Sequence, residues 1–336
     1  MTKQKHSNIS SALHNALEQY QELVGHDFPV VPKLTVHKSK DFWALTEMVD
    51  GDLTISVGGG FLPTLTSLWD DAFCDHDFLS GVGTPFVANK FDAINVSLVW
   101  LVLHELQHYD LGHFDIIGRG FISETERGKS FALVSHSPSQ SPLLEGLSEA
   151  DQSKVEPCLE LQADHEAIEL VLDAYSTDEW PSLRARIASI SSMMMLIERE
   201  DAKMSMEHSS HPKAATRIFQ LLGHVTEMPL IPAQRKAIMS GADAINPVDL
   251  PSDDEQSAFN RQVVIPAFFD AVNLARIAGS DSIRSDLGDA EHFFRDVQIA
   301  KSNDPSMFND LKTIGAKQWA ELVLVNEQIM QLRSES

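Results

Sequence analysis

Residues 92–112 read DAINVSLVWLVLHELQHYDLG, and the organisation of the chain follows from this stretch. Its first half is apolar nearly all the way round a helix, which is typical of a helix that is buried on every side. The helix then ends in HELQH at 104–108, which carries three ionisable side chains. Burying these groups without partners would cost on the order of several kcal/mol, so the pattern predicts that they share a bound metal ion.

The two histidines of HELQH have the spacing of metal ligands. His104 and His108 are four residues apart and therefore about 40° apart around a helix axis, so both imidazoles face one point. A catalytic zinc ion takes three protein ligands and leaves one position for water. Glu105 stands beside the first histidine, where it can accept a proton from that water. We expect His104 and His108 to bind one catalytic Zn²⁺ and Glu105 to be the general base.

A third ligand must come from elsewhere, and ELQAD at 160–164 is the next candidate. It lies in a predicted second helix that begins near Pro157, a residue that suits a first-turn position. Glu160 and Asp164 share a face of that helix. One carboxylate can bind the metal while the other accepts the free N–H of a ligating histidine. Such a pair is more often a solvated acidic stripe, but a buried HExxH elsewhere in the chain favours the metal site.

Two segments together resemble a known family. HELQHYDLGH at 104–113 is similar to the HExxHxxxxH of the zincin metallopeptidases, of the gluzincin type, that include HtpX and the CAAX prenyl endopeptidases. ELQADHEA at 160–167 resembles the glutamate helix of that family. The resemblance implies that Glu160 is the third zinc ligand and that Asp164 supports the site from behind. The soluble Lit-like phage-exclusion peptidases share much of this layout and are the other subfamily that the sequence resembles.

A weaker similarity concerns SSHPKAATRIFQLL at 209–222, which resembles a late His-Pro segment of the same family. It implies that His211 faces the metal and stabilises the oxyanion; the alternative is a histidine at a helix N-terminus with no catalytic part. Arg217 is expected to form a structural salt bridge. His113, five residues beyond His108, is expected to pack or hydrogen-bond near the helix end rather than to bind the metal.

The predicted fold is α+β and mostly helical, with a small, antiparallel-rich sheet beside the HExxH and glutamate helices. Residues 43–49 and 53–57 are predicted to be strands. They flank Asp50-Gly51, a dipeptide suited to a tight hairpin turn. The strand at 53–57 is expected to be an edge strand along which a substrate backbone lies. A run of prolines between 229 and 251 suggests two parts: a zincin-like metallopeptidase domain at 1–225 and a helical C-terminal region at 226–336.

Composition narrows the class of protein. The 336 residues carry 26 basic and 49 acidic side chains, a net charge of −23. Such a charge disfavours binding to nucleic acid or to anionic membranes. The chain has only two cysteines, which we expect to be free thiols in a reducing compartment. Its N-terminus is unlike a signal peptide, which predicts a cytoplasmic location. It has no apolar run long enough to cross a bilayer, which predicts no membrane insertion.

These observations predict a zinc-dependent endopeptidase that cleaves polypeptide substrates. They are compatible with a regulatory protein partner. Two alternatives stay open at this point. In the first, the zinc site belongs to a catalytically silent scaffold or sensor. In the second, the chain is a helical protein-interaction module. Retention of Glu105 argues against the silent site, because a purely structural metal site needs no base.

Overall fold

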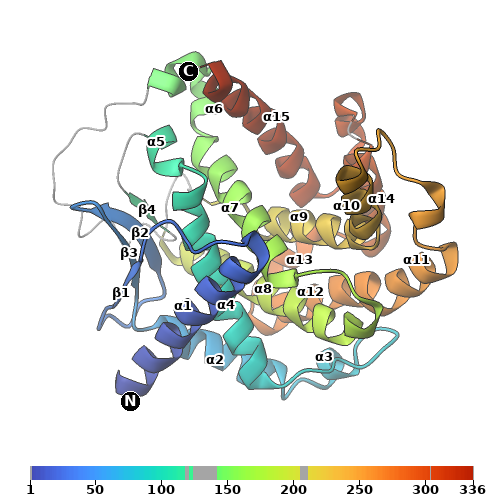
Figure 1. Cartoon of the computed structure of the whole chain (residues 1–336). Coiled ribbons are helices and arrows are strands. Elements are labelled where there is room, and N and C mark those ends of the chain that lie inside the picture. The colour runs from blue at the N-terminus through green and yellow to red at the C-terminus, as the bar shows by residue number, and fades with distance from the viewer. Residues whose placement is uncertain (1, 118–120, 124–141, 205–210, 303, 336) are drawn as a thin grey trace.

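The computed structural model describes residues 2–117, 121–123, 142–204, 211–302 and 304–335. Helices dominate this part of the chain, and a small sheet lies at one side of them (Figure 1). Most of the long loop between the HELQH helix and the ELQAD helix, and Ser209-Ser210 of the His-Pro segment, lie outside the described residues. The helices are α1 (Thr2–Val24), α2 (Phe61–Ala72), α3 (His76–Ser80), α4 (Lys90–Asp110), α5 (His113–Ile117), α6 (Glu149–Gln152), α7 (Val155–Leu172), α8 (Trp180–Asp201), α9 (Ala214–Glu227), α10 (Ile231–Ser240), α11 (Asp253–Phe259), α12 (Ile265–Ile277), α13 (Asp281–Leu287), α14 (Ala290–Lys301) and α15 (Ile314–Glu335).

The sheet has the order β1-β3-β2-β4 and is mixed. Its strands are β1 (Lys33–Val36), β2 (Ala44–Val49), β3 (Asp52–Val57) and β4 (Phe121–Ser123). The hairpin between β2 and β3 is confirmed: Val49 pairs with Asp52, and Asp50 and Gly51 have φ values of 52° and 87°. Both turn residues therefore adopt the positive φ of a type I′ turn, whose twist matches that of the flanking strands.

The predicted edge strand is wrong. β3 pairs in parallel with β1 on one side and antiparallel with β2 on the other, so its backbone hydrogen-bonding groups are taken up within the sheet. A substrate cannot add to β3 without displacing a strand. Two of the three strand pairings are antiparallel, as expected of an antiparallel-rich sheet, and the pairing of β1 with β3 is parallel.

Helix α4, which carries HELQH, runs through the middle of the molecule (Figure 1). The Asn89 side chain caps it by accepting a hydrogen bond from the backbone N–H of Asp92 at 2.9 Å, which satisfies one of the unpaired donors of the first turn. α4 packs against α1, α2, α7 and α8, and it touches β2 and β3. From Ser97 to His108 every side chain is buried, as the apolar pattern predicted.

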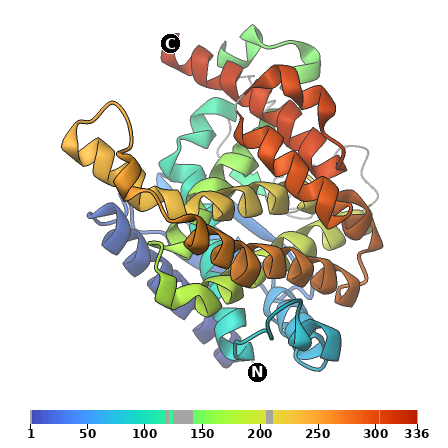
Figure 2. The ribbon, with the colours of Figure 1, turned by 90° about the vertical axis from the view of Figure 1, so that its right-hand side faces the viewer.

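The helices of the C-terminal third are built into the core. α12 packs on α8, and α15 packs on α7 and α9; Figure 2 shows these late helices lying across the rest of the molecule. One hydrophobic cluster joins side chains of both predicted parts, from Trp100 of α4 to Phe268 of α12 and Phe293 of α14. The division into 1–225 and 226–336 stays a prediction, and its boundary falls in the last turn of α9.

Two further expectations concern membranes and thiols. Among the described residues, none of the helices combines the length and the apolar character that crossing a bilayer requires. Cys74 is exposed and Cys158 is buried, and neither forms a disulfide. Cys158 instead donates to the carbonyl oxygen of Leu322 in α15 at 3.2 Å.

A buried ion pair ties α12 to α8 and offers a test of this arrangement. Asp270 accepts two hydrogen bonds from Arg184, at 2.6 and 2.8 Å, and both side chains are almost fully buried. Asp270→Asn leaves the Arg184 charge buried without its partner, so we expect it to lower the free energy of unfolding by about 3–5 kcal/mol. The measurement is urea denaturation followed by circular dichroism.

The matched control is Arg276→Gln, which breaks a second ion pair made by α12. Arg276 contacts Asp75 at 2.7 Å, but this pair is partly exposed. We expect a loss of at most about 1 kcal/mol. Equal losses in the two variants would contradict the burial of the Arg184–Asp270 pair.

Candidate metal centre

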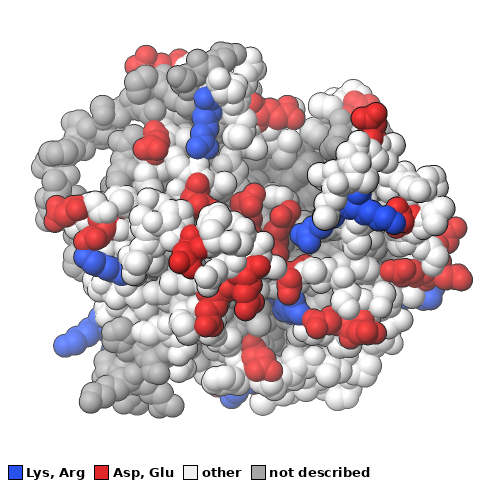
Figure 3. Space-filling view, in the orientation of Figure 1, with Lys and Arg blue, Asp and Glu red and all other residues white. Residues whose placement is uncertain are grey.

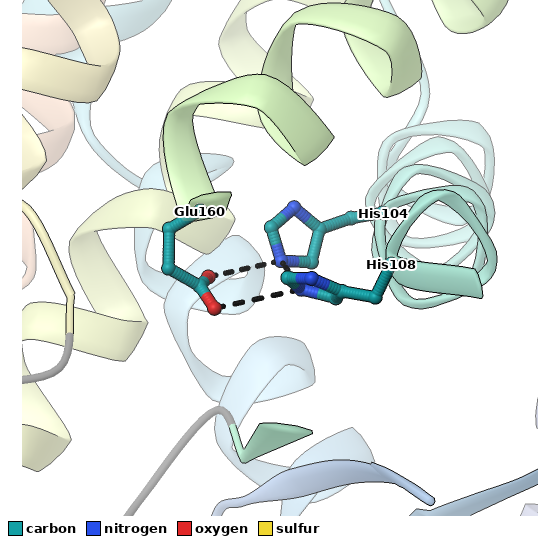
Figure 4. A group of neighbouring side chains, drawn as sticks. All are labelled: His104, His108 and Glu160. Atoms are coloured by element: carbon teal, nitrogen blue, oxygen red, sulfur yellow. Dashed lines mark hydrogen bonds and ion pairs between the residues drawn. The ribbon is translucent and has the colours of Figure 1, made fainter. Parts of the chain in front are cut away.

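Three buried side chains from two helices converge on one point. His104 and His108 project from the same face of α4, and Glu160 approaches from α7 (Figure 4). The two histidine Nε2 atoms are 3.1 Å apart. The Glu160 carboxylate oxygens lie 3.1 Å from His104 Nε2 and 3.5 Å from His108 Nε2. Ligands of a tetrahedral ion with bonds of about 2.0–2.1 Å stand about 3.3 Å apart, so these spacings suit a metal ion.

The far side of His104 faces a charged partner. Its Nδ1 lies 3.0 Å from an oxygen of Asp164, one helical turn beyond Glu160. Asp164 also accepts two hydrogen bonds from Arg217 of α9, both at 2.7 Å. Burial alone would raise the pKa of Asp164, but the Arg217 charge and the hydrogen bonds from His104 and Arg217 hold it below its ordinary value. An ionised Asp164 can only accept, so His104 carries its proton on Nδ1.

The far side of His108 faces a chain of neutral groups. Its Nδ1 lies 2.9 Å from Nδ1 of His113, and His113 Nε2 lies 3.0 Å from the Gln162 carbonyl oxygen. The Gln162 amide in turn donates to Asn326 of α15. Because an amide oxygen only accepts, His113 carries its proton on Nε2 and accepts at Nδ1. His108 is therefore the donor in the histidine pair, and its proton is also on Nδ1.

Burial keeps both members of this histidine pair neutral. It lowers the pKa of His113 to about 3, and burial, reinforced by the neighbouring histidines, lowers the pKa of His108 well below its ordinary value. Each ring therefore carries one proton at neutral pH, as the assignment above requires. The turn that places His113 depends on Gly112, whose φ of +69° favours glycine. It lets α5 start at once and return His113 toward α4.

These proton positions decide what the centre can hold. His104 and His108 both carry a proton on Nδ1, so whenever the two rings are neutral their Nε2 lone pairs face each other and the Glu160 carboxylate. The two Nε2 atoms are 3.1 Å apart, and with both rings neutral three electron-rich groups at this distance repel one another. A cation removes the repulsion, and two imidazoles with a carboxylate form a donor set that divalent metals accept. The residues present therefore fit a metal ion.

Glu105 is buried on the same helix as the two histidines. The hydroxyl of Thr46, in the middle of β2, donates to its carboxylate. This contact brings the sheet into the candidate site, because it positions the Glu105 side chain from a strand and not from a helix. A carboxylate held in this way is oriented by a hydrogen bond while it remains able to accept a proton.

His211 lies beside the group but not among its three atoms. It follows the end of α8, and its Nδ1 contacts the carboxylate of Asp201, the last residue of α8, at 2.8 Å. Its Nε2 is 3.8 Å from Glu160. The ring is thus held by one carboxylate and turned toward another, which suits a group that acts beside the metal. The sequence-predicted residues His104, His108, Glu160, Asp164 and His211 are brought into one cluster.

Several residues of this cluster carry no signal that reading the sequence detected. Thr46 is one hydroxyl in a strand, and Gln162 and Asn326 are amides on helices far apart in the chain. Their contacts with the site depend on which faces of β2, α7 and α15 meet. The expected salt bridge of Arg217 is confirmed, and its partner is Asp164. The expected hydrogen bonding of His113 is also confirmed.

Fold and site together define a mainly helical protein with a buried His-His-Glu group able to hold a metal ion. The sequence profile of one family, Peptidase U49, matches residues 86–229. The matched segment begins just before α4 and ends just after α9, so it contains HELQH, ELQAD and the His-Pro segment. The match supports a peptidase, a hydrolase that acts on polypeptides. Comparisons with curated proteins and with solved structures give no match.

The hydrogen bonds behind His108 run through His113 and Gln162 to Asn326. This hydrogen-bond relay gives a test of the metal centre. His113→Phe keeps a ring of similar size but removes the acceptor that fixes the His108 proton on Nδ1. We expect the affinity for Zn²⁺ to fall by about 10–100-fold, the usual effect of losing a partner of a metal ligand. Competition with a chromophoric chelator measures it.

Gln220→Leu is the matched control for this relay. Gln220 donates from α9 to the Leu161 carbonyl of α7 at 2.8 Å, a part-buried contact outside the relay. The control should bind Zn²⁺ as the wild type does. Unchanged affinity in His113→Phe, with the fold preserved by circular dichroism, would remove His113 from the metal centre.

Proposed function

We propose that this chain is a zinc-dependent endopeptidase in which His104, His108 and Glu160 hold one catalytic Zn²⁺. The observation that carries the proposal is the orientation of the two histidines. Separate partners hold a proton on each Nδ1, which turns the Nε2 atom of each ring toward the Glu160 carboxylate and leaves it to bind a metal in the neutral imidazole. A peptidase profile that matches this same segment supports the reaction class.

The bound zinc ion would act as a Lewis acid that polarises the scissile carbonyl and makes water acidic near neutral pH. Glu105 would accept the proton of the attacking water and later deliver it to the leaving amine. Its hydrogen bond from Thr46 anchors this carboxylate to the sheet. His211 would donate a hydrogen bond to the developing oxyanion, with Asp201 holding its ring in place.

Asp164 and His113 would act as positioning residues in this scheme. Asp164 keeps His104 in the tautomer that can bind metal, and Arg217 keeps Asp164 ionised. Two subfamilies stay candidates for this chain: the zincins of the HtpX type and the Lit-like peptidases. The high acidic charge agrees with a polypeptide substrate rather than a nucleic acid, and a cytoplasmic location remains part of the proposal.

Glu105→Gln separates catalysis from metal binding. The amide cannot accept the proton of the attacking water, so we expect cleavage of a denatured protein substrate to fall by about 10²–10⁴-fold while one equivalent of zinc is retained. Chelation of the wild type should abolish cleavage, and added Zn²⁺ should restore it. Product formation is followed by gel electrophoresis and metal content by mass spectrometry.

The control for this experiment is Glu156→Gln, which changes a partly exposed glutamate in the first turn of α7. It should cleave at the wild-type rate. If wild type carries zinc and cleaves no polypeptide, the silent scaffold or sensor replaces the enzyme. If wild type binds no zinc, the alternative that the chain is a helical protein-interaction module replaces both zinc-containing alternatives. Equal cleavage by wild type and Glu105→Gln would overturn the role of Glu105.

His211→Ala tests the oxyanion role. Loss of one preorganised donor lowers kcat by about 10²–10³-fold, and we expect KM and zinc content to change little, because His211 is not one of the three ligands. Loss of zinc from this variant would instead make His211 part of the metal-binding set. Unchanged kcat would leave it the structural histidine of a helix N-terminus.

A further inference from the structure

A second group of metal-binding side chains lies on α7 and α9, outside the site described above. It consists of His165 and Glu169 of α7 and His224 of α9. His165 Nε2 is 3.3 Å from a Glu169 carboxylate oxygen, and His224 Nδ1 is 4.0 Å from the same oxygen. The two imidazole rings meet edge to face with their centroids 5.7 Å apart. The set repeats the donor chemistry of the first centre: two imidazoles and one carboxylate.

This group is separate from the first centre. Around α7, His165 lies about 140° and Glu169 about 180° from Glu160, so the two groups occupy opposite faces of the helix. Their exposure also differs. The side chains of His165 and Glu169 are 45% and 50% exposed, whereas that of His224 is 10% exposed. An ion can therefore reach the second group from solvent, while its third ligand is held in place by α9.

A comparison within the chain shows what distinguishes this group from an ordinary surface pair. His14 and Glu18 of α1 have the same i, i+4 spacing, and their closest atoms are 3.2 Å apart. Both side chains are well exposed. The pair on α7 differs because a neighbouring helix supplies His224, a mostly buried imidazole directed at the shared carboxylate.

The surroundings favour a cation and leave space beside it. His165 and His224 line a cavity of about 510 Å³ between α7, α9, α14 and α15. Glu166, next to His165 in the chain, also lies in the wall of this cavity. Figure 3 shows acidic side chains gathered over the middle of the face on which α1, α4 and α7 lie. A negatively charged surface raises the local concentration of cations around the molecule.

We propose that His165, Glu169 and His224 form a second, independent site for a divalent transition-metal ion of the zinc class. Three protein ligands leave a coordination position that the adjoining cavity can fill with water or with a small anionic or thiol ligand. One ligand atom from each of the three side chains lies within 4.8 Å of the other two, and the half-exposed Glu169 side chain can adjust its position to an ion.

The test counts zinc equivalents with and without Glu169. Apo-protein is titrated with ZnCl₂ in competition with a chromophoric chelator. Glu169→Gln removes the ligand shared by both histidines, and because Glu169 is half exposed the fold is kept. We expect it to bind one equivalent fewer than wild type, with affinity at the second site at least about 10–100-fold lower. His224→Gln should give the same result.

The matched control is Glu18→Gln, which makes the same change in an i, i+4 pair that has no third ligand. It should bind as many equivalents as wild type. A background of His104→Ala with His108→Ala separates the two sites: one equivalent should remain, and adding Glu169→Gln should remove it. Identical stoichiometry and affinity in wild type, Glu169→Gln and Glu18→Gln would overturn the second site, whatever becomes of the first.

Discussion

The buried ion pair between Asp164 and Arg217 is the interaction on which the candidate centre depends. It joins α7 to α9 through two hydrogen bonds of 2.7 Å, and Asp164 uses the same carboxylate to orient His104 of α4. Buried ion pairs are weak sources of stability, because desolvation offsets their attraction. This pair has another consequence. It links α7 and α9 to α4 through His104, whose Nε2 atom faces the Glu160 carboxylate.

The two ligand histidines are oriented by different means. His104 faces a charge, whereas His108 faces a neutral relay that passes through His113 and Gln162 and ends at Asn326 of α15. The relay makes the last helix part of the site, although the sequence profile of the peptidase family ends at residue 229. The C-terminal region supplies core side chains and one end of the hydrogen-bond chain behind His108.

Local spacing was enough to predict part of this site, but the rest depends on three-dimensional packing. His104 with His108, and Glu160 with Asp164, are i, i+4 pairs whose shared face follows from helix geometry. Thr46, Gln162 and Asn326 act across elements, so nothing near them in sequence indicates their partners. The sheet shows the same limit. The Asp50-Gly51 turn predicted the β2–β3 hairpin, but the parallel partner of β3 is a four-residue strand whose position is set by non-local packing.

Helix α7 brings these observations together. One face carries Glu160 and Asp164, and the opposite face carries Gln162, His165 and Glu169, since positions two, five and nine residues beyond Glu160 lie about 140–200° away. Gln162 lines the cavity and also touches His113, so the relay connects the cavity face with the metal face around the helix. The proton position on His108 is thus fixed by contacts on the side of α7 that faces away from the metal.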